Sequence, residues 1–186
     1  MPQRPAPLTI ELALLGYVRD APLHGYEIYQ QLVASGGLGD VWSVKQPLLY
    51  AHLKRLEAEC LLTGTVEVQS DRPARRLLAI TPAGEAAFAQ WLVQPVTRGR
   101  DLRLEFLAKL YFARREADAV ALRLLGAQDL QLCQWLDRLA VRRHDLPAGA
   151  IYERLVIDYR CGQVTAALTW LAAVRTEFMQ IEPVED

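Results

Sequence analysis

The sequence has no long apolar run and no regular set of cysteines. No apolar segment approaches the roughly 18 residues that span a bilayer. The most apolar stretch, Leu8–Val18, is interrupted by Glu11, and no small-x-small cleavage site follows it. Cys60, Cys133 and Cys161 lie far apart and share no CxxC or Cys/His spacing. These absences predict a cytoplasmic protein with reduced, buried thiols, without a signal peptide or a membrane span.

An excess of charge of either sign is also missing. The formal net charge is −1; residues 1–95 carry eight Lys and Arg against nine Asp and Glu, and residues 96–186 carry thirteen of each kind. Such a balance does not by itself indicate a nucleic-acid binder. Any surface that binds DNA must therefore arise where basic side chains cluster locally.

Sequence motifs of catalysis are absent as well. The chain holds no glycine-rich phosphate loop, no GxSxG and no HExxH, and no pair of carboxylates can be assigned to one cleft. The three histidines, His24, His52 and His144, lie in separate contexts. We therefore expect no enzymatic activity, no metal site and no cofactor.

What the chain does contain is enough apolar material for a core, since 52% of its 186 residues are hydrophobic. Apolar periodicity and helix breakers predict three helices in the first half of the chain. They cover Leu8–Arg19, His24–Val33 and a segment that begins near Gln46. Pro47 suits the first turn of that third helix.

A hairpin and a fourth helix are predicted after these three. The alternating segments TVEVQ and RRLLAIT flank the turn SDRPA, which is the pattern of two antiparallel strands. Thr81 followed by Pro82 predicts the start of a helix that ends near Val93. Three helices, a hairpin and a helix in this order are typical of a winged helix-turn-helix domain.

The third helix has the features of a recognition helix. Leu49, Leu53, Leu56 and Cys60 recur on one stripe that should face the domain, which leaves a slim opposite face to enter a major groove. The residues expected to contact DNA are Lys45, Lys54 and Arg55 at phosphates, Gln46 at a base edge, Tyr50 on the same face, and Arg72, Arg75 and Arg76 at the hairpin tip.

Each of these features also has a plainer interpretation. Lys54 and Arg55 can be a solvated helix face, Tyr50 can cap the core, and an arginine-rich turn can simply be soluble. His52, near the edge of the leucine stripe, is expected to be a packed histidine rather than a DNA-reading residue or a ligand. Only the occurrence of these signals together, in this order, favours nucleic acid.

The second half of the chain predicts helices only. A turn-rich connector, Gln94–Arg100, leads into helices over Asp101–Ala113, Glu116–Arg143 and Ala150–Phe178. The middle helix carries an apolar seam with steps of three and four residues. Such a seam predicts packing against another long helix.

That other helix can belong to the same chain or to a second copy. Leu125, Leu132 and Leu139 of the seam are candidate dimer contacts, and a bundle within one chain is the alternative. In the last helix Gly162 and Ala166 lie four residues apart on one face. Mid-helix glycine costs about 1 kcal/mol relative to alanine. Close approach of a partner helix would explain Gly162, and a tolerated glycine or a kink is the alternative.

Three of the four tryptophans, Trp91, Trp135 and Trp170, lie where the two halves are expected to meet. An apolar cavity lined by these rings would suit a flat aromatic or hydrophobic effector, which could then change the relative position of two DNA-reading heads. Plain core packing of all three rings is the alternative.

Three segments resemble the PadR-like transcriptional regulators: LALLGYVRDAPLHGYEIYQQL, LLYAHLKRLEAECLLTG and RPARRLLAITPAGEAAFAQWL. A fourth, RDLRLEFLAKLYFA, resembles the start of the helical C-terminal domain of the longer, Vir-like members of that family. The resemblance covers nearly the whole chain. It implies a DNA-binding winged helix and a homodimer formed through the C-terminal helices.

The chain departs from the family pattern at three places. Cys60 replaces a glycine that usually follows the recognition helix, so a left-handed helix cap is not expected there. Leu77-Leu78 replaces an aromatic pair in the second wing strand, which removes one expected backbone contact. Pro47-Leu48 replaces small or polar residues before the tyrosine. The family's DNA-contact roles are therefore assigned to Tyr50, Lys54 and Arg55.

The sequence thus predicts a mainly α protein with a winged helix-turn-helix DNA-binding domain over residues 1–95 and a helical dimerisation domain, with a possible effector site, over residues 96–186. The predicted function is that of a homodimeric transcriptional regulator, a repressor that leaves an inverted-repeat operator when a small molecule binds. The alternative is a winged-helix module that binds protein and not DNA. The salt dependence of DNA binding distinguishes the two, because phosphate contacts release counterions.

Overall fold

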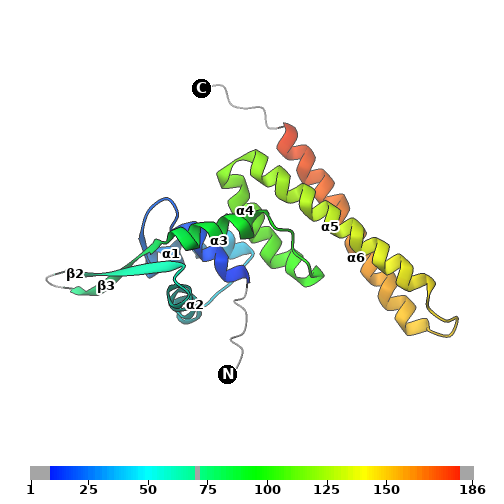
Figure 1. Cartoon of the computed structure of the whole chain (residues 1–186), viewed down its shortest axis with the longest axis horizontal. Helices are drawn as coiled ribbons and strands as arrows, with labels where there is room; N and C mark the ends of the chain where they lie inside the picture. Colours follow the sequence, from blue (N-terminus) through cyan, green and yellow to red (C-terminus); the bar gives the residue numbers. More distant parts are fainter. Residues whose placement is uncertain (1–8, 70–71, 181–186) are drawn as a thin grey trace.

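The computed structural model describes residues 9–69 and 72–180 (Figure 1). The elements in chain order are the 3-10 helix η1 (Thr9–Tyr17), β1 (Leu23–His24), α1 (Gly25–Val33), the 3-10 turn η2 (Leu38–Asp40), α2 (Gln46–Ala58), β2 (Leu62–Gln69), β3 (Arg72–Ile80), α3 (Pro82–Val93), the 3-10 turn η3 (Gly99–Asp101), the π-helical turn η4 (Leu102–Phe106), α4 (Leu107–Glu116), α5 (Asp118–His144) and α6 (Ile151–Gln180). None of the helices within these two ranges is long and apolar enough to cross a membrane.

The predicted winged helix-turn-helix architecture is confirmed. The hairpin of β2 and β3 projects from a small head formed by η1 and α1 to α3, and the antiparallel pair α5 and α6 extends away from that head (Figure 1). The sheet order is β1-β3-β2, with Leu23 opposite Leu78 and Leu62 opposite Ile80. Both strands of the hairpin are longer than predicted, since β3 begins within the expected turn.

Local capping chemistry explains where the helices of the head begin. The Thr81 side chain accepts a hydrogen bond from the Gly84 backbone N–H at 3.0 Å, which confirms the predicted N-cap of α3. The α2 helix has Pro47 in its first turn, as predicted. At α1 the His24 backbone N–H donates to the Glu27 carboxylate at 2.7 Å.

The first predicted helix is helical but tighter than an α-helix. The segment Thr9–Tyr17 forms a 3-10 helix of nine residues. Ile10, Glu11, Ala13, Leu14 and Leu15 are all buried, so the segment is covered on nearly every side. Its apolar side chains do not form one face with a repeat of 3.6 residues. The hydrophobic pattern therefore does not determine the pitch of this helix, and the packing around it does.

The three cysteines are free thiols, as predicted, but the prediction that they are buried is wrong. Cys60 and Cys133 are exposed and Cys161 is half-buried. Cys60 also adopts a left-handed backbone, with φ of 58°, directly after α2. Its N–H donates to the Glu57 carbonyl at 2.9 Å, and the Leu61 N–H donates to the Leu56 carbonyl at 2.9 Å. These are the two bonds of a Schellman cap, which turns Cys60 out of the leucine stripe and into solvent.

One continuous core joins the head to the C-terminal helices. Tyr17 of η1 and Phe88 of α3 both pack edge to face on Phe112 of α4, with ring centroids 5.3 and 5.5 Å from it. The connector after α3 is held by the buried Gln128 of α5, whose side chain accepts from the Val96 N–H at 2.8 Å and donates to the Val96 carbonyl at 3.2 Å. The connector is therefore fixed to α5 through its backbone.

A buried lysine fixes the same connector from the other side. Lys109 of α4 lies 3.0 Å from the Glu105 carboxylate and donates to the Gln94 carbonyl at 2.8 Å. Trp91 donates its indole N–H to Glu105 at 3.1 Å. Burial lowers the pKa of Lys109, and the Glu105 carboxylate opposes that shift. These contacts tie the end of α3 to α4.

The three helices predicted for the second half are present, with two corrections. The segment before α4 is a π-helical turn, so α4 itself starts later than predicted and ends at Glu116. Leu125 and Leu132, two of the three seam leucines predicted to contact a partner chain, are fully buried within one chain. Because α6 folds back along α5, the alternative of a bundle within the chain is correct for these two residues.

Candidate nucleic-acid interface

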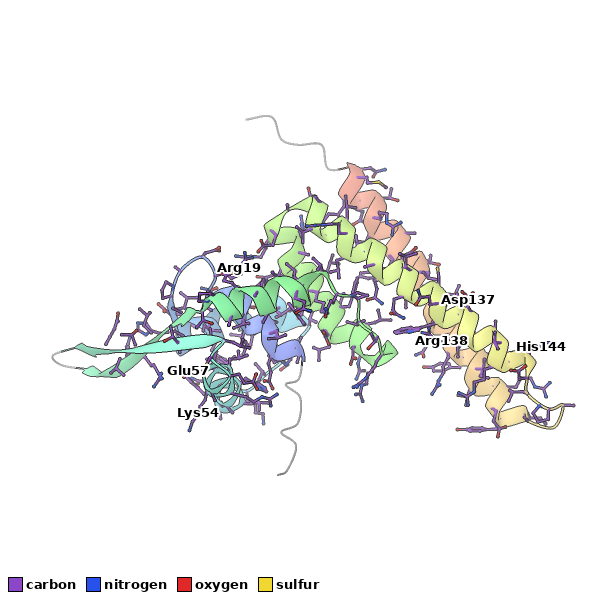
Figure 2. The ribbon with its side chains drawn as sticks, viewed as in Figure 1. Arg19, Lys54, Glu57, Asp137, Arg138 and His144 are labelled. Atoms are coloured by element: carbon purple, nitrogen blue, oxygen red, sulfur yellow. The ribbon has the colours of Figure 1, made fainter. Side chains whose placement is uncertain are left out.

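The α2 helix presents one buried and one open face. Leu49, Leu53 and Leu56 are buried, as the leucine stripe predicted, and they orient the helix on the domain. Lys54 and Tyr50 are exposed on the other face, and Figure 2 shows Lys54 pointing away from the body of the head. The exposed residues at the start of the helix are Lys45, Pro47 and Leu48, beside a half-buried Gln46.

Tyr50 lies where α2, the start of α1 and the wing meet. A Cβ atom added to Gly25 would lie 2.6 Å from the Tyr50 ring, so the ring occupies the space that glycine leaves at the first residue of α1. A small hollow of about 330 Å³ opens at this point, lined by His24, Gly25, Tyr26, Glu27, Tyr50, Arg75 and Arg76. The fold therefore brings Tyr50 together with two of the predicted wing arginines.

The two wing arginines have different surroundings. Arg76 bonds the Glu57 carboxylate of α2 through Nε at 2.9 Å and a terminal nitrogen at 2.8 Å, so it braces the wing against the helix. Arg75 is exposed and lies opposite Glu67 in the hairpin register. The side chain of Arg72 lies outside the described residues. Arg76 is therefore engaged by α2. Arg75 is exposed, and no bond between its side chain and α2 is found in the described part of the chain.

Arg55 is half-buried and pairs with a carboxylate beneath α2. Its Nε lies 3.2 Å from the carboxylate of Glu11 in η1, a residue with no exposed surface, and His52 Nδ1 lies 2.8 Å from the same carboxylate. His52 is buried against the Trp42 ring, which confirms the prediction of a packed histidine. Arg55 therefore connects α2 to η1, contrary to its predicted role at phosphates.

Sequence reasoning missed Glu11 as a residue of this interface. The one signal available was a single carboxylate inside an otherwise apolar segment, Leu8–Val18. A buried charge of this kind requires partners, and its partners stand on the recognition helix. Glu11 therefore holds α2 in place from within the domain and has no exposed surface of its own.

The three tryptophans have different surroundings. Trp91 is buried and bonded to Glu105. Trp170 of α6 is 41% exposed and packs edge to face on Phe106, with centroids 6.1 Å apart. Trp135 is half-buried and lines an open groove that neither of the others reaches. Neither of the two hollows found in residues 9–69 and 72–180 is lined by all three rings, and core packing accounts for Trp91.

A different face of α6 is exposed and apolar. Tyr152, Leu155, Tyr159, Gly162, Ala166 and Trp170 recur at steps of three and four residues, and all are exposed. A Cβ atom added to Gly162 would meet nothing within 4 Å. Gly162 is thus not required by packing within the chain. On the stripe, Trp170 packs on Phe106 and Ala166 borders a groove lined also by segment 98–103, whereas Tyr152, Leu155 and Tyr159 are at least 62% exposed. Leu139 of α5 is half-buried.

Sequence comparisons place this chain among transcriptional regulators. Residues 14–90 match the family model described as the transcriptional regulator PadR-like family, which is not a family of enzymes. A negative transcriptional regulator PadR of Bacillus subtilis is 29% identical over 112 residues, which cover 58% of this chain and 60% of that protein. A transcriptional regulator of Mycobacterium tuberculosis, Rv3488, is 36% identical over 81 residues, which cover 44% of this chain and 70% of that protein. The chain thus matches less than two thirds of the B. subtilis protein.

Solved structures show looser similarity over a longer range. Bacillus subtilis PadR in complex with operator DNA has a TM-score of 0.47 and 23% identity, and the match covers 93% of this chain and 99% of that one. The same protein in complex with p-coumaric acid has a TM-score of 0.41 and 22% identity, covering 92% and 99%. Matches at this level do not assign roles to individual residues.

Proposed function

Because the chain belongs to the PadR-like family of transcriptional regulators, we propose that it is a cytoplasmic, homodimeric repressor that binds operator DNA. In this proposal residues 1–95 read the DNA and residues 96–186 form the dimer. Repression is suggested by the B. subtilis relative, which is a negative regulator. Release would follow when a small molecule binds and changes the relative position of the two heads.

The observation that carries DNA binding is the shape and charge of the α2 surface. The leucine stripe buries one side of the helix, and Lys45, Tyr50 and Lys54 remain exposed on the other. Arg76 holds the wing against this helix through Glu57, which leaves Arg75 exposed beside it. A helix that enters a major groove and a wing that contacts the adjacent backbone require this arrangement. Arg55 is omitted from the proposed contacts because Glu11 engages it.

The exposed stripe of α6 supports the homodimer. Large apolar side chains that remain in water on one helix face, here Tyr152, Leu155 and Tyr159, mark surfaces that bind another protein. Gly162 and Ala166 on the same stripe would let two α6 helices approach closely. A two-fold dimer presents two α2 helices in opposite senses, so the operator should be an inverted repeat with half-sites about 10 bp, or a multiple, apart.

The alternative is a winged-helix module that binds protein and not DNA. The exposed apolar Leu48 at the start of α2 is the observation in its favour. The two proposals differ at Lys54 and Arg75, because only phosphate contacts require those charges. Footprinting across the DNA upstream of its gene decides between them, because a module that binds only protein would protect no DNA. An operator identified in this way is then the probe for variants of these two residues.

We expect Lys54→Ala and Arg75→Ala each to weaken operator binding about tenfold, since each removes one charge-assisted contact to a phosphate. The loss should be similar on unrelated DNA, because phosphates carry no sequence information. Tyr50→Ala should instead also change the preference among operator variants. Gel-shift titration at fixed salt measures all three.

Arg123→Ala is the matched control, since Arg123 is exposed on α5, far along the chain from the head. Its operator affinity should equal that of the parent. If the Lys54 and Arg75 variants also bind like the parent, the α2 surface is not the DNA interface. A parent protein that binds no DNA at all would favour the alternative. Circular dichroism of each variant confirms that the head is folded.

A further inference from the structure

An open groove of about 1,320 Å³ lies on the C-terminal helices, away from α2 and the wing. One wall is the segment 98–103, which begins within the connector. The other is formed by the C-terminal part of α5 and the middle of α6. The lining residues are Arg98, Gly99, Arg100, Leu102, Arg103, Trp135, Arg138, Leu139, Arg142, Arg160, Gln163, Val164 and Ala166. Figure 2 shows Arg138 on α5 near this segment.

The charge of the groove is strongly one-sided. Six of the thirteen lining residues are arginines, and none is Asp or Glu. Within the described part of the chain, the ion pair found for these six is between Arg100 and the neighbouring Asp101, at 3.6 Å. The pair of Arg143 and Asp158 lies outside the groove. Six guanidinium groups around one opening repel each other, and a multiply charged anion would relieve that repulsion.

An aromatic and apolar surface lies among these charges. Trp135 is half-buried, which leaves part of its ring open to the groove, and Leu102, Leu139 and Val164 line the same space. Guanidinium groups bind phosphates and carboxylates through paired hydrogen bonds, and an indole face stacks on a planar ring. The volume exceeds that of a typical small-molecule pocket. A small inorganic anion would leave most of it unfilled.

We propose that this groove binds a small ligand that combines a planar aromatic ring with two or more negative charges. Phosphorylated nucleotides and aromatic polycarboxylates share this chemistry. Trp135 would stack on the ring, and Arg138, Arg142 and Arg160 would hold the charges from α5 and α6. The arginines of segment 98–103 would close on the ligand from the opposite wall.

The place of segment 98–103 in the fold makes this ligand a regulator. The segment directly follows Gln94 and Val96, whose backbones are bonded to Lys109 and Gln128. A ligand that binds Arg98 or Arg103 therefore contacts the segment next to the one that joins the head to α4 and α5. A ligand that binds one arrangement of this attachment better than another shifts the position of the heads. This regulatory consequence rests on the proposed function, but binding itself does not.

Binding is tested by calorimetric titration of the full-length protein with ATP, GTP, benzene-1,2,4,5-tetracarboxylate, inorganic tripolyphosphate and adenosine. We expect saturable binding of a ligand that has both ring and charges, at least about tenfold tighter than that of tripolyphosphate, because stacking adds to the ionic contacts. Adenosine should not bind measurably. Whichever of the nucleotides and the polycarboxylate binds with the higher affinity identifies the chemical class of the ligand.

Two variants test the assigned residues. Arg138→Gln/Arg142→Gln should weaken the binding of the best ligand about a hundredfold, about tenfold for each lost ionic contact. Trp135→Leu should weaken that ligand about tenfold and leave tripolyphosphate unchanged. Arg123→Gln, which removes an exposed arginine of α5 outside the groove, is the control and should bind like the parent.

Two results of the titrations would overturn the proposal: no saturable binding of any charged probe, or parental binding by the double variant. A third would be a double variant that loses affinity for duplex DNA while the parent binds neither a nucleotide nor the polycarboxylate. The last result would assign the arginines to DNA. Operator titration with and without the ligand then separates the groove proposal from the proposed function. If the protein binds the ligand but has no affinity for an operator, the groove proposal is supported and the proposed function is contradicted.

Discussion

Replacing Gly162 with leucine should separate the dimer into monomers and lower operator affinity at least about a hundredfold. The affinity falls because a dimer engages two half-sites at once, and linked binding of this kind adds about a hundredfold to ten-thousandfold over one site. The dimer separates because a leucine at the closest point of two α6 helices would hold their backbones apart. Analytical ultracentrifugation measures the first effect and gel-shift titration the second.

The same substitution should not unfold the chain. A side chain at Gly162 meets nothing within 4 Å, and replacing a mid-helix glycine removes an intrinsic cost of about 1 kcal/mol. We therefore expect an unchanged or slightly raised resistance of the helices to urea. Ala172→Leu is the control, because Ala172 is exposed on the same helix and is not three or four residues from any member of the stripe. A Gly162→Leu protein that sediments as a dimer would contradict the assignment of the stripe as the dimer surface.

Replacing Glu11 with alanine should lower the free energy of unfolding by about 2–4 kcal/mol and weaken operator binding. The Glu11 carboxylate is buried and lies 2.8 Å from His52 and 3.2 Å from Arg55. Breaking a buried pair leaves the remaining partners without compensation, which costs up to about 5 kcal/mol. We expect a cost below that upper limit, because about a third of the Arg55 side chain is exposed and water screens its charge. Urea unfolding monitored by tryptophan fluorescence measures the change.

The operator affinity of Glu11→Ala shows whether Glu11 fixes the position of α2 in addition to stabilising the fold. At temperatures where the variant is fully folded, its affinity should still be lower, because α2 has lost its attachment to η1. Asp158→Ala is the control: it removes the exposed Arg143–Asp158 pair on α5 and α6, and should change neither stability nor binding measurably. Parental stability of Glu11→Ala would show that the buried cluster contributes nothing to the fold.

Much of this fold follows from local signals in the sequence. The leucine stripe of α2, Thr81 at the start of α3 and the alternation in the hairpin are short-range patterns, and each predicted its element correctly. The Cys60 cap could not be predicted, because cysteine has no preference for a left-handed backbone. Tertiary contacts compensate there: the Thr81 hydroxyl donates to the Cys60 carbonyl at 2.7 Å, and the Thr81 N–H donates to the Leu61 carbonyl at 3.1 Å.

The functional surfaces were harder to predict, because they depend on residues far apart in the chain. Lys54 and Tyr50 face solvent because neighbouring leucines point inward, which helical spacing alone determines. Arg55 turns inward because Glu11 lies beneath it, 44 positions earlier in the sequence. The arginine groove was invisible to a count of charges, since residues 96–186 are neutral overall. Only the folding of α5 and α6 against segment 98–103 brings Arg98, Arg138 and Arg160 to one opening.

The salt dependence of operator binding tests the central claim, that α2 and the wing bind DNA, most directly. The logarithm of the association constant, measured for the parent and for Lys54→Ala at several salt concentrations, should fall linearly with the logarithm of salt concentration. Each phosphate contact contributes about −0.9 to that slope, so the variant should be shallower by about one unit. A steep parental slope that Lys54→Ala reduces is the predicted result. Equal slopes for the two proteins, or operator binding that salt does not weaken, would contradict the account.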